Sequence, residues 1–125
     1  MEIRNLGQSG LRVSAICLGC NNFGGRIDEA ATRAVIHKAL DLGITLFDTA
    51  DVYGERGGSE TLMGRILGED RKRIVLATKF GMPMDDVAVK VGGARRYIMQ
   101  EVENSLRRLQ TDWIDLYQMH QPDPL

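Results

Sequence analysis

Apolar runs typical of β-strands alternate along this chain with segments of helical periodicity. The runs are Ala15–Leu18, Thr45–Phe47, Ile74–Ala77 and Trp113–Tyr117. Strands that are separated by helices pair in parallel, because each crossover returns the chain to the same end of the sheet. All C-terminal strand ends should therefore meet at one rim, which is where α/β and barrel enzymes place their reacting groups.

Between the strands lie segments in which apolar residues recur with the period of an α-helix. They cover residues 28–42, 59–67 and 95–110. Asp28 and Ser59 are good N-caps for the first two helices, and a glycine follows each of these helices, as is common at helix ends. The apolar residues that we expect the first and third helices to bury are Ala31, Val35, Ala39, Leu42, Ile98, Val102, Leu106 and Leu109.

Four polar residues lie at or just beyond the C-terminal ends of the predicted strands: Asp48, Tyr53, Lys79 and His120. Lys79 is a cation and Asp48 is its natural counter-charge. An ammonium group favours the phenolate form of a nearby tyrosine, so Tyr53 would become a better proton donor. His120 can donate a hydrogen bond to the oxygen that receives this proton. Such a set suits carbonyl reduction, with a hydride supplied by a cofactor.

Five segments resemble the aldo-keto reductase family. They are R-N-L-G-Q-S-G-L-R-V-S-A-I-C-L-G (Arg4–Gly19), G-I-T-L-F-D-T-A-D-V-Y-G (Gly43–Gly54), S-E-T-L-M-G (Ser59–Gly64), A-T-K (Ala77–Lys79) and D-L-Y-Q-M-H (Asp115–His120). The resemblance extends over nearly the whole chain. The long segment between Asp48 and Glu60 is similar to the bacterial and potassium-channel β-subunit-like branch of the family.

The resemblance implies a role for each of the four polar residues. Tyr53 would be the general acid, Asp48 and Lys79 would tune it, and His120 would orient the carbonyl of an aldehyde or ketone substrate. The implied cofactor is NADPH, and the residues implied to contact it are Gly19, Asn21, Asn22 and Asp48. Turn formation explains the two asparagines equally well.

We therefore predict an α/β fold, the N-terminal half of a (β/α)8 TIM barrel: a β-hairpin over residues 1–14 followed by four parallel strands alternating with helices. Residues 1–125 would form one partial aldo-keto reductase barrel. A complete barrel takes about 250 residues, whereas this chain has 125. By resemblance, most of the cofactor site lies in the other half, so we expect the isolated chain to bind NADPH weakly or not at all. Two copies could also pair as half-barrels through their open sheet edges.

Composition excludes several classes of function. The chain is 43% hydrophobic and 26% charged, with a net charge of −1, so no basic field indicates a nucleic-acid or membrane partner. No apolar signal segment or membrane span is evident, and we expect a cytoplasmic protein. Cys17 and Cys20 have C-x-x-C spacing, but no helix opens directly after them. We therefore favour a buried core thiol and a thiol near the catalytic rim over a redox or metal site, and we expect no metal.

Three interpretations remain open for the function. The chain could be half of an NADPH-dependent reductase, a non-catalytic cofactor-sensing or scaffolding subunit, or an inactive remnant. For two charged features we expect a structural role at the surface rather than a role in the site. Asp51 should face solvent in its loop, and Arg71–Arg73 should form a solvated turn.

Overall fold

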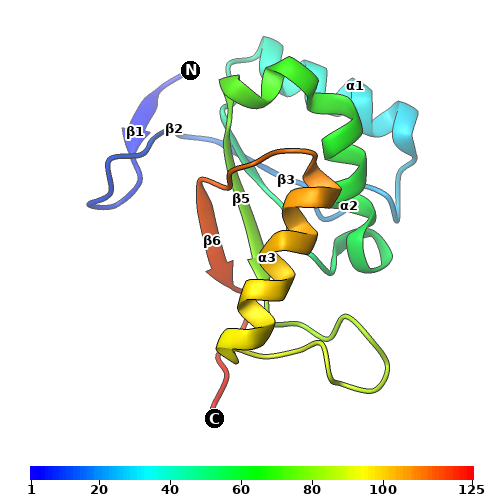
Figure 1. Cartoon of the computed structure of the whole chain (residues 1–125). Coiled ribbons are helices and arrows are strands. Elements are labelled where there is room, and N and C mark those ends of the chain that lie inside the picture. Colours follow the sequence, from blue (N-terminus) through cyan, green and yellow to red (C-terminus); the bar gives the residue numbers. More distant parts are fainter.

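The computed structural model describes all residues, 1–125. Its main sheet has four strands in the order β3-β4-β5-β6, and every neighbouring pair is parallel. The strands are β3 (Cys17–Gly19), β4 (Leu46–Asp48), β5 (Val75–Phe80) and β6 (Leu116–Met119). Their C-terminal ends lie at the lower end of the molecule in Figure 1, together with the loop that precedes α3. The predicted parallel half-barrel arrangement is confirmed.

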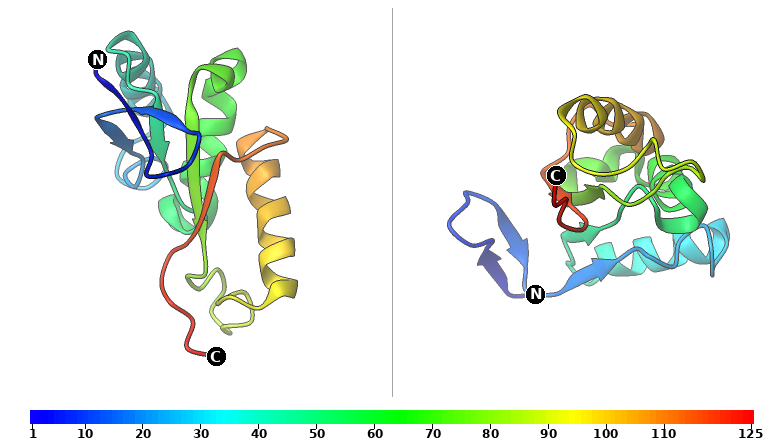
Figure 2. Two further views of the ribbon diagram at one scale, coloured as in Figure 1. Left: turned by 90° about the vertical axis from the view of Figure 1, so that its left-hand side faces the viewer. Right: turned by 90° about the horizontal axis from the view of Figure 1, so that it is seen from below.

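The helices are α1 (Glu29–Asp41), α2 (Tyr53–Leu67), α3 (Arg95–Leu109) and the short 3-10 helix η1 (Gly68–Arg73). The hairpin of β1 (Ile3–Asn5) and β2 (Arg12–Ser14) projects away from the layer of helices (Figure 2). Ser14 ties this hairpin to the segment before β4, because its hydroxyl accepts the backbone N–H of Thr45 at 2.9 Å. None of the helices combines the length and the apolar character that a membrane crossing requires.

The core lies between the helices and one face of the sheet. Phe47 and Leu76 are fully buried on this face, against Ile36 of α1 and Met63 of α2. Each such side chain contributes about 1.5–3 kcal/mol through its burial. Because successive residues of a strand point to opposite faces, Asp48 and Lys79 lie on the other face of the sheet, where they remain partly accessible.

The faces predicted for α1 and α3 are partly wrong. α1 buries Ala39 as expected, but Val35 and Leu42 are 38% and 54% exposed. They lie toward the edge strand β3, where no further element covers them, and Ile36 and Leu40 point into the core instead. On α3 the buried residues are Tyr97, Glu101, Ser105 and Leu109. Polar side chains occupy this face because it packs against a charged group of α2. The helical spacing of apolar residues does not reveal such a face.

α2 contains an irregular first turn ahead of the predicted helix, whose start near Ser59 agrees with the structure. Residues 54–57 all have positive φ, including Glu55 and Arg56, so the right-handed helix begins only after them. Gly54 is required here, because a Cβ would collide with the carbonyl oxygen of Phe23. Ser59 is not an N-cap: its hydroxyl donates to Cys20 O at 2.8 Å and contacts Thr49 Oγ1 at 2.8 Å. It thereby fastens α2 to the ends of β3 and β4.

The predictions for the first strand and its cysteines also need correction. The strand spans Cys17–Gly19 rather than residues 15–18, and it is not buried, because it forms the edge of the sheet. Cys17 is exposed on the uncovered face, whereas Cys20 is fully buried in the core. Cys17, expected to be buried within its strand, is therefore exposed. Cys20 follows the strand beside Asp48 as expected, with its N–H donating to Asp48 O at 2.9 Å, but its thiol is buried. Both thiols are free.

Candidate active site

Lys79 and Asp48 form the centre of the predicted site. They lie on neighbouring strands β5 and β4, and Lys79 Nζ is 2.7 Å from both carboxylate oxygens of Asp48. The third ammonium hydrogen is donated to Thr49 O at 2.8 Å. All three donors of the lysine are therefore used, and its position is set from two directions. The Lys79 side chain is only 14% exposed, so a counter-charge at this distance offsets the cost of desolvating the ammonium.

Tyr53 and His120 complete the set from two other elements. Tyr53 begins α2 directly after the loop that follows β4, and its ring meets the ring of His120 edge-to-face, with centroids 5.6 Å apart. Lys79 Nζ lies 5.2 Å from the centroid of the Tyr53 ring, within the range of a cation–π contact. Since the ammonium hydrogens of Lys79 are taken by Asp48 and Thr49, its influence on Tyr53 acts through space. The structure thus brings all four predicted residues together.

The surroundings of His120 favour its neutral form. Burial lowers the pKa of its imidazole below the ordinary value, and the positive charge of Lys79 lowers it further, while Asp48 opposes both effects. Its backbone N–H donates to Phe80 O at 2.8 Å, which continues the β5–β6 pairing to the rim. Ring atom Nδ1 is buried and has no hydrogen-bond partner, while Nε2 stays accessible. The imidazole is therefore free to orient an oxygen placed beside Tyr53.

The residues expected to contact a cofactor lie beside this set. Gly19 pairs with Asp48 across the β3–β4 register, and a Cβ added to Gly19 would meet nothing within 4 Å. Asn21 and Asn22 follow in the next loop and are exposed. The backbone carbonyl of Asn22 accepts from Arg26 and Ile27, so turn formation accounts for part of its role. The sheet surface at Gly19, next to Asp48, is therefore not covered by other residues of the chain.

A buried charged layer behind the site was missed by the sequence analysis. Arg108 of α3 donates to Glu60 Oε2 and to Glu101 Oε1, both at 2.6 Å. The hydroxyl of Thr78 on β5 donates to Glu60 Oε1 at 2.6 Å. Glu60 and Glu101 are 0% and 1% exposed. One signal was available: acidic and basic residues seven positions apart in one predicted helix share a face, as Glu101 and Arg108 do.

Asp51 belongs to this layer, and the expectation that it faces solvent is wrong. Its side chain is fully buried. Its backbone N–H donates to Lys79 O at 3.1 Å, so the segment after β4 continues to run beside β5 and turns the Asp51 side chain inward. The sequence resembles an exposed turn at this point, because only the tertiary position of α3 covers it.

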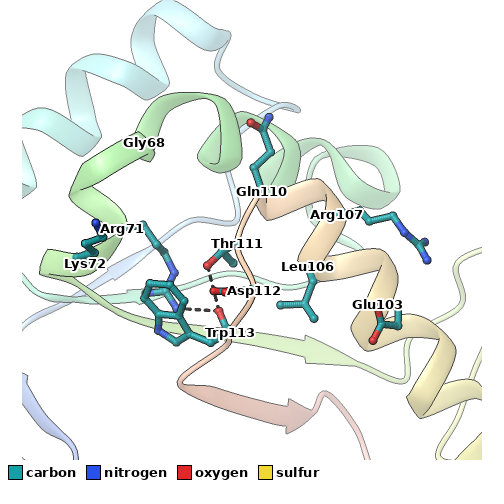
Figure 3. A pocket seen from close by; sticks show the side chains of 10 residues that line it. All are labelled: Gly68, Arg71, Lys72, Glu103, Leu106, Arg107, Gln110, Thr111, Asp112 and Trp113. Atoms are coloured by element: carbon teal, nitrogen blue, oxygen red, sulfur yellow. Dashed lines mark hydrogen bonds between the residues drawn. The ribbon is translucent and has the colours of Figure 1, made fainter.

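A hollow on the surface lies away from these residues. It has a volume of about 740 Å³ and is lined from η1, the end of α3 and the segment before β6 (Figure 3). Arg71 lies here, but it is only 6% exposed and pairs with Asp115 at 2.9 Å, so it is no solvated turn residue. Its guanidinium also lies 4.1 Å from the centre of the Trp113 ring. These contacts close the opposite rim and involve none of the four predicted catalytic residues.

Comparison with known proteins agrees with this geometry. The profile of the aldo/keto reductase family matches residues 15–125. The chain is 44% identical to the aldo-keto reductase YhdN of Bacillus subtilis, an alignment that covers 100% of the chain and 39% of YhdN. It is 39% identical to the L-glyceraldehyde 3-phosphate reductase of Escherichia coli K12, over 98% of the chain and 37% of that enzyme.

A solved structure shows the same arrangement of elements. The aldo-keto reductase AKR11C1 from Bacillus halodurans, in its holo form, superposes with a TM-score of 0.84 at 41% identity, over 95% of this chain and 40% of that one. The chain thus spans about two fifths of the length of the relatives it matches. Because the family profile covers most of the chain and the fold agrees, this protein belongs to the aldo/keto reductase family.

Proposed function

We propose that this chain carries the proton-donating part of an NADP(H)-dependent oxidoreductase that reduces aldehydes and ketones to alcohols. The observation that carries the proposal is the convergence of Tyr53, Lys79 and His120 at one rim of the sheet, with Asp48 holding the lysine. The tyrosine hydroxyl is the only acid in this set that can give up a proton to an alkoxide and be stabilised as an anion by a fixed neighbouring cation.

Each side chain has a distinct task in the proposed reaction. Tyr53 transfers its hydroxyl proton to the carbonyl oxygen as that oxygen gains negative charge. Lys79 stabilises the resulting phenolate, and Asp48 keeps the ammonium in place. His120, neutral because its pKa is lowered, donates a hydrogen bond that orients the carbonyl without competing as a strong acid.

The residues present fit a dinucleotide bound against the uncovered face of the sheet beside Asp48 and Gly19. A Cβ added at Gly19 would meet no atom within 4 Å, so the backbone there is open to a ligand, and the exposed residues Asn21 and Asn22 follow shortly after in the chain. A bound reduced nicotinamide would supply the hydride. Preference for NADPH over NADH and the identity of the carbonyl substrate are parts of the proposal that draw on the family relationship. One relative is named as a reductase of an aldehyde phosphate, and another was solved in a holo form.

For the isolated chain we propose weak NADPH binding and no turnover. The chain matches only about two fifths of its relatives, and none of its loops has the glycine-rich pattern that cradles phosphates. Micromolar affinity of the purified chain for NADPH in a fluorescence titration would contradict this part of the proposal.

The reductase function can be tested in a chimera. Residues 1–125 would replace the matching segment of YhdN, to which they are 44% identical, and NADPH oxidation would be followed with an aromatic aldehyde. We expect Tyr53→Phe to lower kcat by about 10²–10⁴-fold, the usual contribution of a general acid, with NADPH affinity unchanged. His120→Gln should also lower turnover, whereas His37→Gln, on the exposed side of α1, is the matched control. Unchanged turnover in Tyr53→Phe would refute the acid role.

A chimera that binds NADPH but turns over no carbonyl compound would favour a cofactor-sensing or scaffolding role instead. A chimera that folds but binds no cofactor would favour an inactive remnant. The three interpretations of the sequence therefore give three different outcomes in one experiment.

A further inference from the structure

Asp51 is the one carboxylate of the buried charged layer that has no partner. The residue is 0% exposed, and neither oxygen has a hydrogen-bond partner at the usual distance and angle. The backbone N–H of Val52 lies near the carboxylate and favours its ionised form, but it is the smallest of the effects on the Asp51 pKa. The other two carboxylates of the layer are saturated: Glu60 receives Thr78 and Arg108, and Glu101 receives Arg108 and Asn104. A buried ionised carboxylate without donors is strongly unfavourable.

The charges around Asp51 also oppose its ionisation. The groups that face it are Glu60 from α2, Glu101 and Arg108 from α3, and the phenols Tyr97 from α3 and Tyr117 from β6. Arg108 is the single cation among them and already serves two carboxylates, so the layer carries one negative charge before Asp51 is counted. Lys79, the next cation, is fully used by Asp48 and Thr49.

Two phenols lie in the same buried region as Asp51, but neither makes a hydrogen bond with it. The hydroxyls of Tyr97 and Tyr117 are buried and have no hydrogen-bond partner of their own. Burial raises the pKa of each phenol, and the charges of Glu101 and then of Asp51 raise it further. Three unpartnered polar groups therefore occupy one region. A neutral carboxyl group can both donate and accept a hydrogen bond, whereas a carboxylate can only accept. The neutral form is therefore the better match for a region that contains other unpartnered hydroxyls.

We propose that Asp51 is a protonated, neutral carboxylic acid in the folded protein, and that it acts as a positioning residue for Tyr53, because only the neutral form lets the turn between β4 and α2 stay packed against the buried charged layer. The proposal rests on the proposed function only in naming Tyr53 as the group positioned. Asp48 and Asp51 then have different roles: the first pairs with Lys79 and faces the site, and the second is neutral and faces the interior.

The backbone explains how the protonation state of Asp51 affects the position of Tyr53. Thr49 N–H donates to Ala77 O at 2.9 Å and Asp51 N–H donates to Lys79 O at 3.1 Å. The segment is therefore aligned with β5 up to Asp51, and Tyr53 follows two residues later, where its N–H donates to Ala50 O at 3.3 Å. If Asp51 ionised, the buried charge would require water or movement of this turn, and the Tyr53 ring would move with it.

Burial and the charges of Glu101 and Glu60 raise the pKa of Asp51 from 3.8 to about 7. The sign of the effect on stability follows from this direction. Between the two values the folded state keeps a proton that the unfolded chain releases, so the folding equilibrium weakens as pH rises, by up to about tenfold per pH unit, and levels off above pH 7. Asp51→Asn, a neutral analogue of the same shape, should lack this component.

The first test is a carbon NMR titration of the aspartate carboxyl groups in the unsubstituted chain, with Asp51 assigned through its backbone. We expect its midpoint near pH 7. A midpoint in the ordinary range of aspartate, near 4, would overturn the proposal. This measurement requires neither cofactor nor turnover, so its failure is independent of the proposed reductase function.

The second test follows the ring resonances of Tyr53 against pH. We expect them to shift with the same midpoint as Asp51, and in Asp51→Asn to lose this step while keeping any step caused by His120, whose pKa lies lower. Asp41→Asn removes an exposed carboxyl of α1 and is the control. A titrating Asp51 whose ionisation leaves Tyr53 unmoved would overturn its role as a positioning residue. Asp51→Ala should perturb Tyr53 at every pH, and the asparagine variant should restore it.

Discussion

Removal of the Arg108 charge should destabilise the protein far more than any other single change to a surface-accessible cation. The arginine side chain is 21% exposed, yet it contacts two carboxylates that are 0% and 2% exposed at the side chain. The variant Arg108→Met keeps much of the side-chain volume and removes both ion pairs. Glu60 and Glu101 would then be buried in the fold without a cation.

The expected loss follows from these contacts. Each bond at 2.6 Å is charge-assisted, and breaking a buried pair by removing one partner typically costs about 3–5 kcal/mol. A domain of this size has a free energy of unfolding of about 5–15 kcal/mol, so about a fifth or more of the stability would be lost. The midpoint of thermal unfolding should fall by about 10–20 °C.

Chemical denaturation followed by circular dichroism measures this loss, and the chain offers a matched control one residue away. Arg107 lies in the same helical turn, is exposed, and donates only to Asn104 at 2.8 Å. Arg107→Met should change the free energy of unfolding by about 0.5 kcal/mol or less. If Arg108→Met and Arg107→Met had equal stability, the buried layer would not be a structural unit and the reasoning would fail.

A variant in which all three charged residues are replaced distinguishes the contribution of the ion pairs from the cost of leaving buried carboxylates without a cation. Replacing Glu60, Glu101 and Arg108 together by apolar residues of similar size removes the uncompensated carboxylates. Buried ion pairs often lose little when the whole group is replaced, so this variant should recover most of the stability that Arg108→Met loses. Thr78 would then need a valine, because its hydroxyl donates to Glu60.

Two further predictions concern packing and assembly. Gly64→Ala should destabilise the chain by about 1–3 kcal/mol, because a Cβ would collide with the backbone of Arg108 and Leu109 where α2 crosses α3; Gly10→Ala, which meets nothing within 4 Å, is the control in the same denaturation assay. We also propose that two copies pair through the open edges β3 and β6, each of which has one neighbour in the sheet, with the half-buried Leu46, Val75 and Leu116 covered on pairing. Light scattering should show a fraction of dimer that increases with protein concentration. A folded species that stays monomeric at high concentration would rule this out.

Much of the site could be read from local sequence because strand ends carry positional information. A polar residue directly after an apolar strand lies at the rim of a parallel sheet whichever residues surround it. Asp48, Lys79 and His120 were located in this way, and the structure brings them to Tyr53. The N-cap of α1 is equally local: Asp28 accepts the N–H of Ala31 at 2.9 Å, as its position before the helix predicts.

The buried layer could not be found in the same way. Asp51, Glu60 and Glu101 have the composition of solvent-facing residues, and nothing in their immediate neighbours distinguishes them from such residues. Their burial depends on the crossing of α2 and α3, where Gly64 allows the backbone of α3 to approach closely. That crossing is a contact between segments more than 40 positions apart in the chain, which no short-range pattern encodes.

The sequence by itself determined the order of strands and helices, the parallel sheet and the four residues at its rim, because hydrophobic period and strand ends are local properties. Tertiary structure alone decided which residues are covered. It exposed Cys17 on an edge strand, buried Cys20, and placed the polar face of α3 against α2. It also turned Asp51 away from solvent, because burial depends on what packs from elsewhere in the chain rather than on the residue and its neighbours.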